Sequence, residues 1–107
     1  MGQDTVGSFE FQLLAVLLEQ PCDAYGISIM ERIRDRTGRT PNLGTVYKGL
    51  DRLREKGMVN SWWGEPTEER GGRRKRYYRI EPSGREAVRR VRELTQAFGP
   101  ILQPIGA

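Results

Sequence analysis

Apolar residues in the middle of the chain recur with the spacing of one face of a helix. They lie three, four and three positions apart, at Leu43, Val46, Leu50 and Leu53. This pattern predicts an amphipathic helix over residues 43–56, which Asn42 can cap and Gly57 can end. The opposite face combines hydrogen-bond donors with a ring that can stack, through Thr45, Tyr47, Lys48 and Arg52.

Two further helices are predicted before this one. Residues 9–19, capped by Ser8, are apolar on nearly every face. A helix of this kind is buried on more than one side, which favours a second chain covering part of it. Residues 24–37 carry one apolar stripe between Asp23, a capping residue, and Gly38, a terminating residue.

The hydrophobic period shortens after residue 57. Residues 58–63 and 75–80 are rich in strand-forming side chains and flank a charged loop over 64–74, which predicts a hairpin. Trp62 and Trp63 are adjacent on the first strand, so at most one of them is expected to face the core.

A last helix is predicted from Pro82 to about Phe98, with an apolar stripe and an apolar, uncharged tail after it. The pattern as a whole predicts a mainly α fold with a small β-hairpin. It divides the chain into an N-terminal arm over 1–7, three helices and a hairpin over 8–81, and a C-terminal helix with its tail over 82–107.

The composition excludes several classes of protein. At 107 residues the chain is one domain, and its uncharged runs are too short to span a bilayer. It has no histidine, which excludes His-based metal sites and Ser-His or Cys-His catalysis. Cys22 is the single cysteine, so an internal disulfide is excluded and a small buried side chain is expected. We expect a cytoplasmic protein that is not an enzyme and uses no metal or cofactor.

Positive charge is concentrated in one part of the sequence. The net charge is +4, but residues 70–92 hold ten basic and two acidic side chains, and the rest of the chain is net acidic. Fifteen of the 18 basic residues are arginine, which suits bidentate contact with phosphates or guanine edges. The alternative interpretation is an ordinary solvated basic face.

The order of the predicted elements is that of a winged helix-turn-helix. A turn over residues 38–41 joins helix 24–37 to helix 43–56, and the hairpin forms the wing. In this geometry the third helix enters the major groove of DNA with its N-terminal residues leading. The hairpin tip over 70–76 holds five basic residues and two glycines, which suits contact with the DNA backbone or the minor groove.

Four motifs in this order resemble the PadR family of bacterial transcriptional regulators. They are Tyr25-Gly26-Ile27, Leu43-Gly44-Thr45-Val46-Tyr47, Glu55-Lys56-Gly57-Met58-Val59 and Arg76-Tyr77-Tyr78-Arg79-Ile80, and the likeness covers about residues 9–92. The resemblance implies a homodimeric winged helix-turn-helix repressor whose C-terminal helix dimerises with help from the first helix. Dimer symmetry in turn predicts a near-palindromic operator.

The resemblance has limits that bear on function. Members commonly have proline where this chain has Leu43, so Asn42 alone must start the third helix. Glu81 stands where a Ser or Thr cap is usual before the last helix. Some members release DNA on binding a small-molecule inducer. Others stack flat drugs on a tryptophan of the C-terminal helix, where this chain has only Phe98 as an aromatic residue.

Two surfaces follow from these observations. The predicted DNA contacts are Tyr25, Asn42, Thr45, Tyr47, Lys48, Arg52, Arg73, Arg74, Lys75 and Arg76. The predicted dimer contacts are Leu14, Leu17, Val88, Val91, Leu94, Phe98, Ile101 and Leu102. Arg79 is expected to pack or to form a salt bridge. The alternative function is a winged-helix adaptor that binds a protein through the apolar tail over 98–105.

Overall fold

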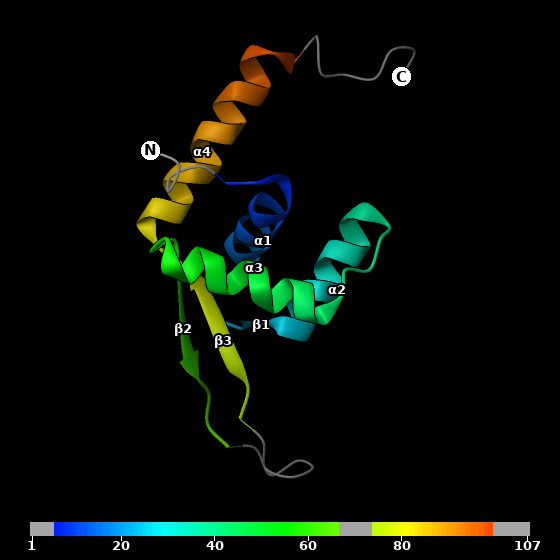
Figure 1. The fold of residues 1–107 in the computed structure, drawn as a ribbon, viewed down its shortest axis with the longest axis vertical. Coiled ribbons are helices and arrows are strands. Elements are labelled where there is room, and N and C mark those ends of the chain that lie inside the picture. The colour runs from blue at the N-terminus through cyan, green and yellow to red at the C-terminus, as the bar shows by residue number, and fades with distance from the viewer. Residues whose placement is uncertain (1–5, 67–73, 100–107) are drawn as a thin grey trace.

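The computed structural model describes residues 6–66 and 74–99. The elements in chain order are α1 (Ser8–Glu19), β1 (Ala24–Tyr25), α2 (Gly26–Thr37), α3 (Leu43–Glu55), β2 (Val59–Trp63), β3 (Arg76–Ile80) and α4 (Pro82–Ala97). Helix α1 packs against α2, α3, α4 and β3. In Figure 1 the β2–β3 hairpin projects beyond α3, and α4 extends away from the opposite end of the molecule. The predicted fold, mainly α with a small hairpin wing, is confirmed.

The sheet has three antiparallel strands in the order β1-β3-β2. Strands β2 and β3 form the predicted hairpin, with Val59 opposite Ile80 and Trp63 opposite Arg76. The sequence does not predict the third strand, β1, and the expected helix start at Ala24 with Asp23 as its cap is wrong. Ala24 is fully buried and its backbone pairs with β3, so α2 begins only at Gly26.

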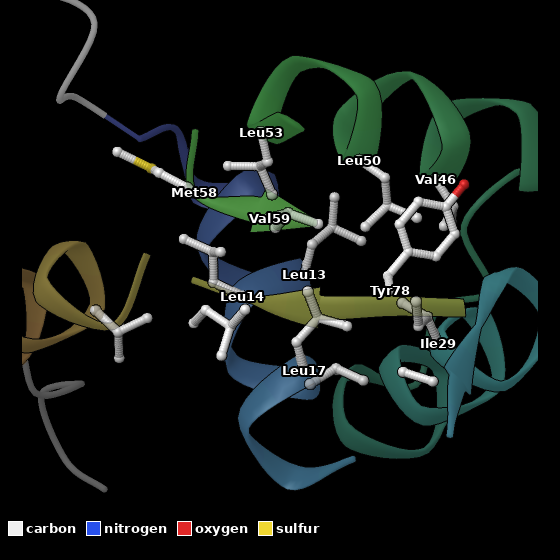
Figure 2. Packing of buried hydrophobic residues seen from close by; sticks show 14 of the residues in the cluster. Leu13, Leu14, Leu17, Ile29, Val46, Leu50, Leu53, Met58, Val59 and Tyr78 are labelled. Carbon is white, nitrogen blue, oxygen red and sulfur yellow. The ribbon is translucent and has the colours of Figure 1, made fainter. Parts of the chain in front are cut away.

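The core lies between α1, α3 and the sheet. Figure 2 shows Tyr78 of β3 beneath Val46 and Leu50 of α3. The inward stripe predicted for α3 is confirmed at Val46, Leu50 and Leu53, which are fully buried, whereas Leu43 at the start of the helix is half-buried. Burial raises the pKa of the Tyr78 phenol above its ordinary value.

Three expectations about individual residues are wrong. Leu14 and Leu17 are fully buried among the chain's own core residues, so their side chains cannot form contacts between two chains. Cys22 is exposed, because it lies in the turn between α1 and β1 rather than inside an element. Ser8 is the first residue of α1 rather than its cap; Gly7 precedes the helix, and its N–H donates to Glu10 Oε1 at 3.0 Å.

Three glycines determine how neighbouring elements meet, two at helix ends and one at a close packing contact. Gly38 and Gly57 have φ of 77° and 76°, the left-handed conformation that lets α2 end where the sequence predicts and α3 end one residue earlier than predicted. A Cβ atom at Gly84 would lie 2.5 Å from the Met58 carbonyl oxygen. The missing side chain therefore lets the first turn of α4 sit directly on the segment that leads into β2.

None of the helices in the described part of the chain combines the length and the apolar character needed to cross a membrane.

Candidate nucleic-acid interface

The exposed face of α3 carries three of the predicted DNA contacts. Thr45, Lys48 and Arg52 are exposed and line a groove of about 660 Å³ that also includes Gly7 and Ser8 at the start of α1. Lys48 and Arg52 form no ion pair with any residue that the structure describes. Their charges are therefore available to an anionic partner.

Asn42 begins α3 as the sequence predicts. Its side-chain Oδ1 accepts hydrogen bonds from the backbone N–H groups of Gly44 at 2.8 Å and Thr45 at 3.4 Å. The side-chain amide group lies at the exposed N-terminal end of α3 and makes no hydrogen bond to the described residues. One end of this side chain therefore caps the helix and leaves the other end free to donate.

Tyr47 is held on the flank of α3 by the N-terminus of α2. The side chain is 40% exposed, and a Cβ atom at residue 26 would overlap its hydroxyl and ring. Gly26 thus gives the Tyr47 ring its place against α2. This contact brings two predicted DNA-contact positions, Tyr25 and Tyr47, to neighbouring parts of the surface.

An ion pair joins the other flank of α3 to α1. Lys56 Nζ lies 2.9 Å from Glu10 Oε1, and the two side chains are only 21% and 12% exposed. Burial raises the pKa of the Glu10 carboxyl, but the Gly7 N–H, the Lys56 ammonium and the Arg52 guanidinium oppose this, and the net pKa is below the ordinary value. The pair therefore ties α3 to the start of α1 beside the groove.

Aromatic side chains cover one face of the hairpin and reach β1. Trp62 stacks on Tyr77 with ring centroids 5.8 Å apart, and Tyr77 meets Tyr25 edge to face at 6.1 Å. Lys75 Nζ lies 4.4 Å from the centre of the Tyr25 ring, and the Arg79 guanidinium lies 5.2 Å from that of Trp62. This row links the wing strands to the strand that leads into α2.

The opposite face of the hairpin carries Arg76 and Trp63. Arg76 donates from Nε and Nη2 to Ser61 Oγ at 3.2 and 3.0 Å. Its guanidinium lies 5.5 Å from the centre of the Trp63 ring, and Trp63 is 56% exposed. Strand alternation in the sequence predicts that Trp62 and Trp63 lie on opposite faces. It does not predict that Trp63 is exposed beside an arginine.

The remaining predicted wing residues differ in how far the structure describes them. Arg74 and Lys75 are exposed at the outer end of the wing, just before β3 begins at Arg76. Arg73 and the tip residues before it lie outside the described residues.

Basic side chains away from α3 and the wing mostly have acidic partners. On α2, Arg32 and Arg36 both pair with Glu19 of α1. On α4, Arg89 pairs with Glu86 and Glu93, and it lowers the pKa of the Glu86 carboxyl. Within the described part of the chain, Lys48, Arg52, Arg74, Lys75 and Arg76 have no such partners. Among the described residues, cations without an ion pair therefore lie on α3 and the wing, and also at Arg39, Arg85 and Arg92.

A second surface is an apolar groove of about 600 Å³ between α1, α2 and α4. Its apolar lining residues are Phe11, Ala15, Val16, Leu18, Ile33, Val88 and Val91. Of the predicted dimer contacts, Val88 is 6% exposed and Val91 is half-buried in the groove wall, whereas Leu94 and Phe98 are 60% and 52% exposed. Ile101 and Leu102 lie outside the described residues.

Comparison with known proteins agrees with this architecture. Residues 13–90 match the model of the transcriptional regulator PadR-like family. The chain belongs to this family. Its members are DNA-binding transcriptional regulators rather than enzymes, so both the suspected family and the expectation that the chain is not an enzyme are confirmed. No curated protein matches the chain.

Solved structures extend the comparison to the whole fold. A PadR family transcription regulator from Clostridium difficile is 22% identical, with a TM-score of 0.75 over 90% of this chain and 95% of that chain. A transcriptional regulator from Clostridium thermocellum is 25% identical, with a TM-score of 0.72 over 96% and 100%. A PadR family regulator from Eggerthella lenta is 25% identical, with a TM-score of 0.63 over 85% and 80%.

Across residues 6–66 and 74–99, no group of three or more acidic, cysteine or histidine side chains lies in a position to hold a metal ion.

Proposed function

We propose that this PadR family member is a homodimeric, sequence-specific repressor that acts on DNA in the cytoplasm. Helix α3 would enter the major groove, and the basic wing would contact the backbone or minor groove beside it. The observation that carries the proposal is the set of cations on α3 and the wing that lack acidic partners among the described residues, while Arg32, Arg36 and Arg89 are paired. Such charges bind phosphates with release of counterions.

The side chains on α3 divide into two roles. Lys48 and Arg52 project from its exposed face and would contact base edges or nearby phosphates. Asn42, Thr45 and Tyr47 lie at the N-terminal end, which leads into the groove in this fold. Tyr25, Arg73, Arg74, Lys75 and Arg76 would supply positioning contacts from β1 and the wing.

The apolar groove supports the homodimer. Leu94 on α4 and Phe98 just after it expose large apolar surfaces next to a groove lined by α1, α2 and α4. A second copy would cover the groove with its own α4, bringing together Val91, Leu94 and Phe98, and the tail residues Ile101 and Leu102 would add to this contact. Two α3 helices about 34 Å apart would then meet successive major grooves of a near-palindromic operator.

The test is fluorescence anisotropy of the full chain against its own upstream promoter DNA and a scrambled duplex, each at low and near-physiological salt. Promoter binding is expected to survive the higher salt, whereas scrambled binding is expected to disappear. Equal, salt-sensitive binding to both duplexes would contradict sequence-specific binding to this promoter. Absence of binding even at low salt would contradict the DNA function and favour a protein-binding adaptor.

Variants separate the helix from the wing. Lys48→Ala and Arg52→Ala are expected to weaken binding and relax base preference, whereas Arg74→Ala and Lys75→Ala weaken all sequences about equally. Arg89→Ala, which removes a cation already paired within α4, is the matched control and is expected to bind as the unchanged chain does. An equal loss on promoter and scrambled DNA for all four test variants would contradict the role of α3.

Repression is tested separately, with a reporter gene placed behind the same promoter. Expression is expected to rise when the chain is deleted and to fall when it is restored. A small molecule that raises expression and lowers the affinity for promoter DNA in the anisotropy assay would identify an inducer.

A further inference from the structure

Trp63 and Val59 lie on the same face of the hairpin. Helix α3 packs over the inner part of this face, and Trp63 lies on the outer part, which α3 does not reach. Along β2, alternate residues face the same side of the sheet, so Trp63 shares a face with Ser61 and Val59. Val59 is buried in the core, whereas Trp63 at the far end of the strand is 56% exposed. The hairpin projects past α3 (Figure 1), and Trp63 is the last residue of β2, at the outer end of that projection.

Arg76 is held beside this indole by several contacts. It is the register partner of Trp63, and its guanidinium lies 5.5 Å from the Trp63 ring centre and 5.8 Å from that of Tyr78. Two of its nitrogens donate to Ser61 Oγ. Asp51 and Glu55 of α3 line the same groove as Arg76, but neither forms an ion pair with it, and the contacts to Ser61 and the two rings orient the positive charge before any partner binds.

A flat apolar side chain beside an oriented arginine fits the minor groove of A·T-rich DNA. That groove is narrow, and its enhanced negative potential attracts arginine, while apolar side chains of minor-groove proteins pack against or between base steps. We propose that Trp63 and Arg76 together form a minor-groove contact that selects A·T-rich steps flanking the sequence contacted by α3. This inference rests on the proposed DNA-binding function and adds a source of specificity outside the major groove.

The neighbouring tryptophan provides a matched control within the same strand. Trp62 lies on the opposite face, where it stacks on Tyr77 and supports Arg79. The chain has only these two tryptophans. Trp62→Phe therefore leaves Trp63 as the sole indole, and Trp63→Phe leaves Trp62.

The first experiment measures tryptophan emission and DNA anisotropy in the same titration. The probe is a duplex that the full-length chain has selected from a random-sequence pool. For the Trp62→Phe protein, binding is expected to shift or quench the emission, because Trp63 would leave water and meet the groove. For the Trp63→Phe protein, emission is expected to stay constant while anisotropy still rises. Constant Trp63 emission at saturating DNA would overturn the inference without affecting the proposed function.

The second experiment changes only the minor groove of the flanks. Replacing flanking A·T pairs by G·C places the guanine amino group in the minor groove and is expected to weaken binding on the order of tenfold. Replacing them by inosine·cytosine, which lacks this amino group but keeps the major-groove acceptors of guanine, is expected to restore the affinity. Equal binding to all three flanks would overturn the inference.

Side-chain variants connect the two experiments. Trp63→Ala and Arg76→Gln are expected to bind the A·T and G·C flanks alike, with the loss confined to A·T-flanked duplexes. Trp62→Phe is expected to keep the flank preference. Loss of the preference in Trp62→Phe as well would assign it to the whole wing rather than to this pair. If anisotropy shows no binding of the unchanged chain to any duplex, both the DNA function and this inference are wrong.

Discussion

Asn42 is a residue whose side chain could serve the helix, the DNA or both. Its Oδ1 caps α3, while its amide group makes no hydrogen bond within the described structure. Asn42→Asp keeps the cap, because Asp and Asn are about equally good at this position, but it replaces a donor by a negative charge. We expect unchanged thermal stability and DNA affinity lowered on the order of tenfold, measured by calorimetry and anisotropy.

The comparison variant Asn42→Ala removes the cap itself. It is expected to cost about 1 kcal/mol in the free energy of unfolding. If Asn42→Asp binds DNA as tightly as the unchanged chain, the residue acts only as a helix cap.

Glu10 gives the fold a measurable dependence on pH. Its carboxyl is less basic in the folded chain than in the unfolded chain, so its stabilising contribution is present above the unfolded pKa and lost as the pH falls through the folded pKa. Glu10→Gln is expected to lower the free energy of unfolding by about 1 kcal/mol at neutral pH, and by less in acid. Urea unfolding between neutral pH and about pH 3 measures the difference.

The control for this pair is Glu86→Gln on α4. Arg89 also lowers the pKa of the Glu86 carboxyl, but the group is exposed. Exposed ion pairs contribute little, so its unfolding curve should follow that of the unchanged chain at every pH. A Glu10→Gln protein with the same acid dependence as the unchanged chain would contradict the assigned role of the Glu10–Lys56 pair.

At the scale of elements, the row of rings that joins β1 to the wing is a specific point of weakness. Tyr77→Ala removes both the stacking on Trp62 and the edge-to-face contact with Tyr25. We expect a loss of about 1 to 2 kcal/mol in stability and faster hydrogen exchange of the amides in β1 and β3. Trp63→Ala, which removes an exposed ring from the other face, should leave both quantities nearly unchanged. Equal exchange in the two variants would mean that the row does not hold the wing.

The elements also differ in how well the sequence predicts them. Helix α3 has a regular apolar stripe, a capping Asn42 and a terminating Gly57, and its prediction is wrong by only one residue at its end. Strand β1 has two residues, too few for a period to appear, and it exists because its backbone pairs with β3. Local pattern therefore predicts the third helix and the hairpin, whereas contacts between distant segments decide where α2 begins.

The same distinction applies to the two candidate surfaces. The charged residues of α3 could be found from the sequence because their exposure follows from the apolar stripe on the other side. Leu14 and Leu17 could not be assigned in this way, because α1 is apolar on nearly all faces and only the packing shows which faces its own chain covers. The exposure of Trp63 likewise could not be predicted, because it depends on how far along β2 helix α3 packs.

At the scale of the whole molecule, the dimer determines whether two α3 helices can act on one operator. Leu94→Glu places a charge in the exposed apolar surface of α4, where a second copy would desolvate it. Ala97→Glu adds the same charge at another exposed position on the same helix, where the small side chain offers no large apolar surface, and serves as the matched control. Sedimentation analysis is expected to show a monomer for Leu94→Glu and a dimer for Ala97→Glu at micromolar concentration.

The loss of the dimer has a consequence for DNA that the loss of a cation does not have. A monomer can occupy only one half-site at a time, so Leu94→Glu is expected to bind full and half operators with equal affinity per site, whereas the control strongly prefers the full operator. The buried α1–α3 core is untouched by the substitution, so the circular dichroism spectrum of the monomer should remain helical. A Leu94→Glu protein that stays dimeric would place the interface elsewhere, and a folded monomer in the unchanged chain would leave the apolar groove open to another protein.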